Sequence, residues 1–174
     1  MTIINGLKEG LYQRKIKKCI SHTKKRKATN LNNAKSIGLL FHASNDSDIQ
    51  IVKKYRKELQ RQHKKVTWLG YKNIKTLNGN EEFPCFCNKD LGLSMTPKKA
   101  SVKQFINQKF DILISLHTKE CLPLEYISAA SSAYFRIGHY QENKVASYDF
   151  MVYGKTKSLR AYIQQMETYL KKIY

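Results

Sequence analysis

A chain of 174 residues is long enough for one domain and short for two. Hydrophobic residues make up 41% of it, with 11 Tyr and 7 Phe, which excludes disorder throughout, and only 8 Gly and 3 Pro exclude a collagen-like or Gly-rich chain. The 32 Lys and Arg outnumber the 13 Asp and Glu, so the formal net charge is +19. Self-repulsion at this charge predicts an anionic partner.

The first fifth of the chain holds about half of the excess charge. Residues 1–35 carry ten Lys or Arg and one Glu, a net charge of +9, whereas residues 36–174 carry +10. Apolar residues such as Leu7, Leu11 and Ile16 follow helical spacing, and an Asn-rich link comes after them. We predict a basic amphipathic helical extension and link over residues 1–35. We expect its apolar stripe to dock on a single α/β domain formed by residues 36–174.

The rest of the chain alternates between strand and helix patterns. Predicted strands cover residues 36–41, 66–71, 110–116, 134–138 and 148–153. Predicted helices cover residues 49–62, 122–133 and 158–173, and residues 72–100 are predicted as a long loop with one short strand near 84–87. The first and third strands are apolar on both faces, as in a sheet that helices cover on both sides. The pattern predicts a three-layer α/β fold with a mostly parallel sheet, of the flavodoxin or Rossmann kind.

Three histidines directly follow predicted strands. The carboxyl ends of parallel strands meet at one edge, where ligands of this architecture bind, and imidazole can act as a base, a ligand or a donor. The candidate ligand-binding residues are His42, Ser44, His117, Thr118, Lys119 and His139. The simpler interpretation, that polar residues merely end apolar strands, is favoured because no nucleophile, acid or glycine loop accompanies them.

Common catalytic and cofactor motifs are absent from the sequence. It contains no G-x-G-x-x-G, no G-x-x-x-x-G-K-[ST] and no G-x-S-x-G. A metal site could be assembled from Cys85, Cys87, His117 and Cys121, but Cys-x-Cys is a poor spacing for structural zinc. Free cysteines are usually small core residues. We therefore assign no catalytic residue, no cofactor and no metal.

Basic residues cluster in two segments, one in the extension and one around the first helix of the body. The candidate nucleic-acid-binding residues are Lys15, Lys17, Lys18, Lys24, Lys25, Arg26, Lys27, Lys53, Lys54, Arg56, Lys57, Arg61, Lys64 and Lys65. Lys and Arg contact phosphates, and no RNP, KH or helix-turn-helix signature predicts readout of a base sequence.

The sequences and order of four segments resemble those of a bacterial family of small basic proteins of unknown function. These segments are residues 36–41, 66–71, 110–114 and 133–138. This resemblance covers nearly the whole chain and implies no activity and no site residues. Residues 111–117 and 133–138 are also similar to the amino-terminal half of heptosyltransferases, which use nucleotide-activated sugars. The chain ends where the second, sugar-nucleotide-binding half would begin, so this likeness implies a shared fold rather than shared catalysis.

These features predict a non-enzymatic protein that binds RNA without sequence preference, with ribosomal RNA as one candidate partner. A small-molecule-binding protein or enzyme, with its site at the carboxyl edge of the sheet, is one alternative. Attachment of the basic N-terminal helix to an anionic membrane surface is another. The sequence shows no secretory signal and no apolar run of membrane-spanning length, which predicts a cytoplasmic protein with reduced thiols.

Overall fold

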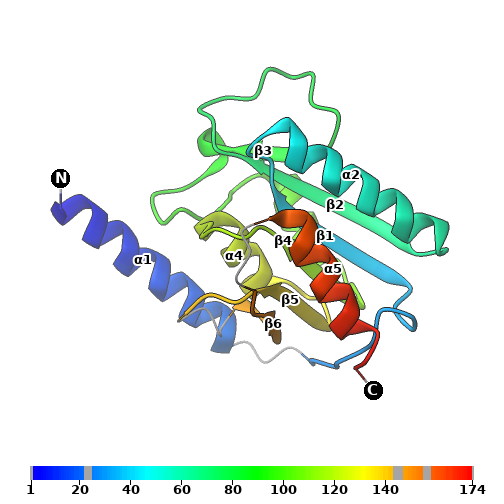
Figure 1. Ribbon diagram of the computed structural model, residues 1–174. Helices are drawn as coiled ribbons and strands as arrows, with labels where there is room; N and C mark the ends of the chain where they lie inside the picture. The colour runs from blue at the N-terminus through cyan, green and yellow to red at the C-terminus, as the bar shows by residue number, and fades with distance from the viewer. Residues whose placement is uncertain (1, 22–24, 143–146, 155–157, 174) are drawn as a thin grey trace.

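The computed structural model describes residues 2–21, 25–142, 147–154 and 158–173 (Figure 1). The strands in this part of the chain are β1 (Ser36–His42), β2 (Lys65–Lys72), β3 (Cys85–Cys87), β4 (Ile112–Leu116), β5 (Phe135–His139) and β6 (Phe150–Val152). The α-helices are α1 (Thr2–Ser21), α2 (Asp46–Arg61), α3 (Ala100–Asn107), α4 (Leu122–Ala130) and α5 (Leu159–Leu170), and a short 3₁₀ helix, η1, spans Asn88–Asp90.

The six described strands form one sheet in the order β3-β2-β1-β4-β5-β6, and each strand is parallel to its neighbours. This is the strand order of the doubly wound Rossmann fold. The predicted α/β fold with a parallel sheet is therefore confirmed. The direction of winding reverses between β1 and β4, so the topological switch point lies at the carboxyl ends of these two strands.

Helices cover both faces of the sheet. On one face, α2 and α5 pack against strand residues such as Leu39 and Ile114, and on the other, α3 and α4 pack against residues such as Leu40 and Leu113. Strands β1 and β4 contribute to both cores because they are buried on both sides. This is why their sequences are continuous apolar runs.

An aromatic cluster fills the core between β1, β2 and the segment before β3. Phe41 has no exposed surface, and its ring centroid lies 5.7 Å from that of Trp68 and 5.0 Å from that of Phe83. Gly70 lies against the same rings, because a Cβ there would come within 2.6 Å of Phe83 and 2.9 Å of Phe41. Arg56 of α2 closes the cluster by stacking on Trp68 at 4.6 Å.

Helix α1 forms an additional layer outside α4 (Figure 1). Tyr12 and Ile16 are buried against α4, and the Tyr12 hydroxyl donates to the Leu122 carbonyl at 3.1 Å. The expected docking of the extension is confirmed, although Leu7 of the predicted stripe is 67% exposed. The link that follows is also packed, since Leu31 and Ala34 lie in the core beneath α2 and α5.

A partly buried ion pair ties β5 to the segment that precedes β6. The Arg136 guanidinium donates to both carboxylate oxygens of Asp149, from Nε at 3.0 Å and from Nη2 at 2.8 Å. Arg26 of the link lies 3.9 Å from the same carboxylate and donates to the carbonyls of Ser131 and Ala133. Asp149 therefore sits between two arginines from distant parts of the chain.

Two predicted elements differ from the structure, and one helix of the structure has no predicted counterpart. Helix α4 ends at Ala130 rather than 133, because Ser131 is extended and its Oγ accepts from Ala133 N–H. The last strand is only Phe150–Val152, since Tyr148 turns its ring into the interior. Helix α3 was not predicted. Its buried residues are Val102 and Phe105, with Ile106 packed partly buried beside them, and no side chain caps its start.

Candidate nucleic-acid interface and carboxyl-edge pocket

A groove of about 540 Å³ lies between α1, the loop of residues 92–98 and α3, and we call it the α1 groove. Among the described residues that line it, none is a carboxylate and five are cations. These cations are Arg14, Lys15, Lys18, Lys98 and Lys103. Three of them come from one side of α1 and two from a segment at least 80 positions later, so the groove depends on the docking of α1.

The loop that forms the far wall of the α1 groove turns back on itself. The Gly92 N–H donates to the Thr96 carbonyl at 2.9 Å, and Leu91 and Pro97 form an antiparallel bridge. The Lys98 side chain lies over Gly92, where a Cβ would come within 2.6 Å of Lys98 Cε. Glycine at this position thus leaves room for the lysine stem.

The other predicted cations of the extension have different surroundings. Lys17, Lys25 and Lys27 are exposed. Arg26 is engaged with β5 and α4, as described above. Burial and the nearby Arg136 both lower the pKa of Arg26. Lys24 lies outside the described residues.

The cations around α2 divide into two groups. The first group is exposed and consists of Lys54, Lys57, Arg61 and Lys65. The second group is engaged within the protein: Lys53 pairs with Glu82, Arg56 stacks on Trp68, and Lys64, only 8% exposed, donates to the carbonyls of Asn32 and Ala34. Desolvation lowers the pKa of Lys64. The second group is therefore not available for contacts to phosphates.

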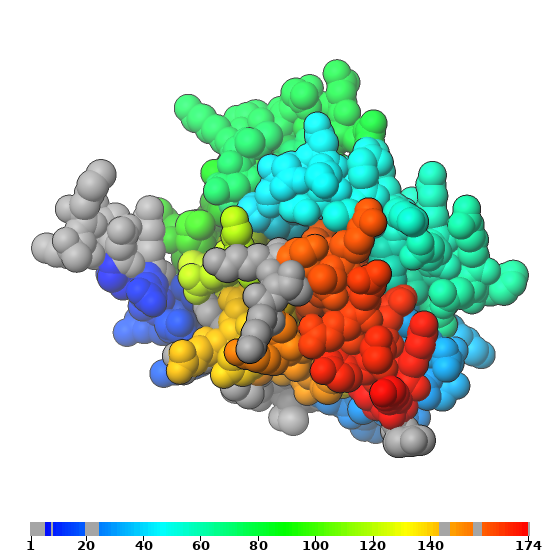
Figure 2. Space-filling view, in the orientation of Figure 1, coloured from blue at the N-terminus to red at the C-terminus, as the bar shows by residue number. Residues whose placement is uncertain are grey.

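The two basic segments do not form one surface. Helix α2 covers one face of the sheet, whereas α1 packs outside α4 on the opposite face. Figure 2 shows the α1 surface (blue) and the α2 surface (cyan) separated by other parts of the chain. A ligand that contacts the α1 groove therefore does not reach α2 without bending around the molecule.

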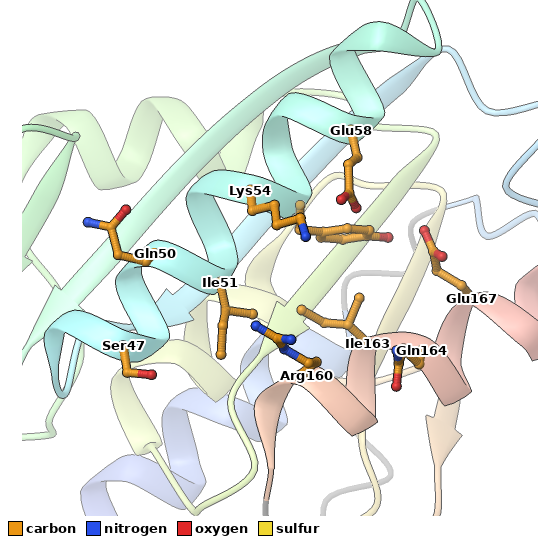
Figure 3. A pocket seen from close by; sticks show the side chains of 10 residues that line it. Ser47, Gln50, Ile51, Lys54, Glu58, Arg160, Ile163, Gln164 and Glu167 are labelled. Atoms are coloured by element: carbon orange, nitrogen blue, oxygen red, sulfur yellow. The ribbon is translucent and has the colours of Figure 1, made fainter.

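A second groove, of about 640 Å³, lies between α2 and α5 (Figure 3). Lys54 and Arg160 line it together with Glu58 and Glu167. The charges are balanced, so this groove suits a polyanion less well than the α1 groove does.

The predicted carboxyl-edge residues meet in a smaller pocket of about 170 Å³. Of the six candidates, His42, Ser44, His117, Thr118 and Lys119 line it. His139 does not, because its Nδ1 lies 2.9 Å from the Tyr140 carbonyl and its ring packs edge-on against Tyr162.

Both ring nitrogens of His117 have partners. Nδ1 lies 2.9 Å from the Lys119 carbonyl, so it carries the hydrogen, and Nε2 accepts from the Tyr148 hydroxyl at 3.3 Å. The ring is 4% exposed, and burial lowers its pKa although the Lys119 bond and Glu125 act in the opposite direction. His117 is therefore a neutral, fixed side chain that holds residues 117–119 in place.

The buried His117 predicts a loss of stability in mild acid. Its pKa in the folded state lies below the unfolded value of about 6.5, so the unfolded state binds more protons below that pH. We expect the urea midpoint to fall between pH about 7 and about 5.5, and the His117→Gln variant to show a weaker fall. His63→Gln, at an exposed histidine, is the control and keeps the wild-type dependence. A flat wild-type profile over this range would contradict the prediction.

The cysteines do not converge. All four are free, and Cys85 and Cys121 belong to cores on opposite faces of the sheet. Burial raises the pKa of the Cys121 thiol to about 12. No group of three or more His, Cys, Asp or Glu within the described residues is arranged to hold a metal ion.

Strand order, covering helices and a pocket at the switch point define a doubly wound α/β protein. A family model described as a family of unknown function (DUF6913) matches residues 8–173, and the chain belongs to this family. The predicted resemblance to a family of unknown function is thus confirmed. No curated protein sequence matches the chain, and the likeness to heptosyltransferases has no support from these comparisons.

None of the described helices has both the length and the hydropathy of a membrane span.

Proposed function

We propose that this protein binds RNA without sequence preference and that the α1 groove is the binding surface. The observation that carries the proposal is the convergence of five cations from α1, the 92–98 loop and α3, with no carboxylate among the described lining residues. The phosphate backbone offers regularly spaced negative charges, and Lys or Arg contacts to them release counterions. Lys17, exposed on the same helix, extends the cationic surface.

Salt dependence is the signature of such a surface. If all five groove cations contact phosphates of a single strand, the plot of log K against log salt has a slope of roughly −3.5. Affinity for a mixed-sequence RNA should be close to that for a homopolymer, since contacts to phosphates carry no base information.

We expect Lys15→Glu with Lys103→Glu to weaken RNA binding at least about tenfold and to reduce the salt slope by roughly 1 to 2. These two residues stand on opposite walls of the groove. The matched control is Lys57→Glu with Arg61→Glu on α2, which changes the net charge equally on the other face of the sheet. Fluorescence anisotropy with labelled RNA at several salt concentrations measures both the affinity and the salt slope. Equal losses in the two double variants would show that total charge, not the groove, governs binding.

Attachment to an anionic membrane is the second candidate function. The observation that favours it is the presence of exposed Leu7 and Leu93, 67% and 77% exposed, on α1 and on the loop that lines the α1 groove. Flotation with anionic and neutral liposomes separates the two proposals. Membrane attachment would be the better proposal if the protein floats with anionic liposomes and shows no salt-dependent RNA binding. The double variant Leu7→Ser with Leu93→Ser should then lose flotation.

We also propose a cytoplasmic location. Its support is that all four cysteines are free, as in proteins of reducing compartments.

A further inference from the structure

The carboxyl-edge pocket contains polar groups that the proposed RNA surface does not use. It lies at the switch point between β1 and β4, where doubly wound proteins bind ligands, and on residues separate from those of the α1 groove. Its volume of about 170 Å³ is below the usual range of roughly 300–1,000 Å³ for drug-sized ligands. The pocket therefore suits a ligand of a few heavy atoms, and it is too small for a nucleotide.

His42 is the group in this pocket whose hydrogen bonding is incomplete. Its Nδ1 lies 3.0 Å from Ser44 Oγ, whereas its Nε2 is buried and has no hydrogen-bond partner in the described structure. The ring stacks on Tyr71, and desolvation lowers its pKa. A buried polar atom without a hydrogen-bond partner is energetically unfavourable, so a ligand atom that bonds to Nε2 removes this cost.

The charges around His42 limit the class of ligand. Lys119 places an exposed ammonium at the rim, and Asp48 places a carboxylate on the opposite wall, where Asn45 Nδ2 holds it at 2.9 Å. Asn45 Oδ1 accepts from the Asp48 N–H at 2.9 Å, so the first turn of α2 is already capped and carries its own acids, Asp46 and Asp48. A doubly charged phosphate in the pocket would be repelled by the Asp48 carboxylate more strongly than a singly charged ligand.

We propose that the pocket binds a small organic acid with one carboxylate and one neighbouring hydroxyl or amino group. The carboxylate pairs with Lys119 and accepts from His42 Nε2, and the hydroxyl or amino group donates to Asp48. His117 is a positioning residue here. Its bond to the Lys119 carbonyl fixes the backbone from which the lysine projects, and both of its nitrogens are engaged.

The test uses the full chain and three probes: glycolate, acetate and inorganic phosphate. We expect glycolate to shift the ring resonances of His42 in NMR spectra with a Kd of roughly 1 mM, and to leave those of exposed His63 unchanged. Acetate, which lacks the hydroxyl, is expected to bind about tenfold more weakly. Tighter binding of phosphate than of glycolate would overturn the assigned ligand class.

Variants localise the site. Lys119→Gln and His42→Phe should each weaken glycolate binding at least about tenfold, whereas Lys109→Gln, at an exposed lysine outside the pocket, leaves it unchanged. The Lys15→Glu with Lys103→Glu variant should bind glycolate like the wild type, so failure of the RNA proposal and failure of this one are distinguishable. Glycolate shifts that do not saturate, or that persist in Lys119→Gln, would overturn the site.

Discussion

Replacing Asp149 with alanine is expected to lower the free energy of unfolding by about 2–4 kcal/mol, less than for a fully buried pair because the Asp149 side chain is 20% exposed. The substitution removes the carboxylate that accepts two hydrogen bonds from the Arg136 guanidinium, whose side chain is only 8% exposed. It also removes the anion that faces Arg26, so two partly or fully buried cations lose their counterion. Chemical denaturation of wild type and variant measures the difference.

Two further variants test this explanation. Glu142→Ala removes an exposed carboxylate from the same region and should change the unfolding free energy by less than about 0.5 kcal/mol. Arg136→Met combined with Asp149→Leu removes this pair of charges, and it should recover part of the loss because Arg136, the more deeply buried of the two cations, no longer lacks a counterion. A double variant less stable than Asp149→Ala alone would mean that packing, rather than charge, dominates at this site.

Phe41→Ala is expected to lower the free energy of unfolding by about 3–5 kcal/mol, by a different mechanism. The ring has no exposed surface and contacts Trp68 and Phe83, so its removal leaves a cavity next to a central strand. Strands on both sides of β1 restrict collapse into this space. Thermal and urea unfolding, followed by Trp68 fluorescence, report the change directly because Trp68 is the only tryptophan.

The control for the cavity is an apolar residue that is not buried. Leu7→Ala truncates a side chain that is 67% exposed and should change stability by less than about 0.5 kcal/mol. Phe41→Leu keeps most of the volume and should cost about 1–2 kcal/mol. Equal effects of Phe41→Leu and Phe41→Ala would argue against cavity formation as the cause.

The central strands could be predicted because their burial leaves a local pattern. β1 and β4 are covered by helices on both faces, so their interior positions are apolar except for the buried Ser115, and each run is followed by or ends at a histidine. Helices α2 and α5 were predicted for the same reason, because each places one apolar stripe on the sheet. The meeting of His42 and His117 followed from strand direction alone.

The α1 groove could not be predicted, because it is a product of tertiary contacts. Lys98 and Lys103 lie in a stretch where Gly92 and Pro97 indicate a loop, and nothing in the local sequence shows that α1 packs beside it. The adjacent lysines Lys98 and Lys99 indicate a basic surface in this stretch. Only Lys98 lines the groove, because Lys99 donates to the Cys85 carbonyl. The hydrogen bonds of Lys64 and Arg26 to backbone carbonyls could not be predicted either. The local sequence does not distinguish a buried lysine or arginine from an exposed one.

The position of α1 against α4 also affects when the protein can complete its structure during translation. Tyr12 and the carbonyl it binds belong to residues 110 positions apart. A nascent chain therefore carries this cationic helix without its packing surface until α4 has been synthesised, and β1 waits similarly for β4. Contacts between such distant parts of the chain slow folding and prolong the exposure of apolar surface.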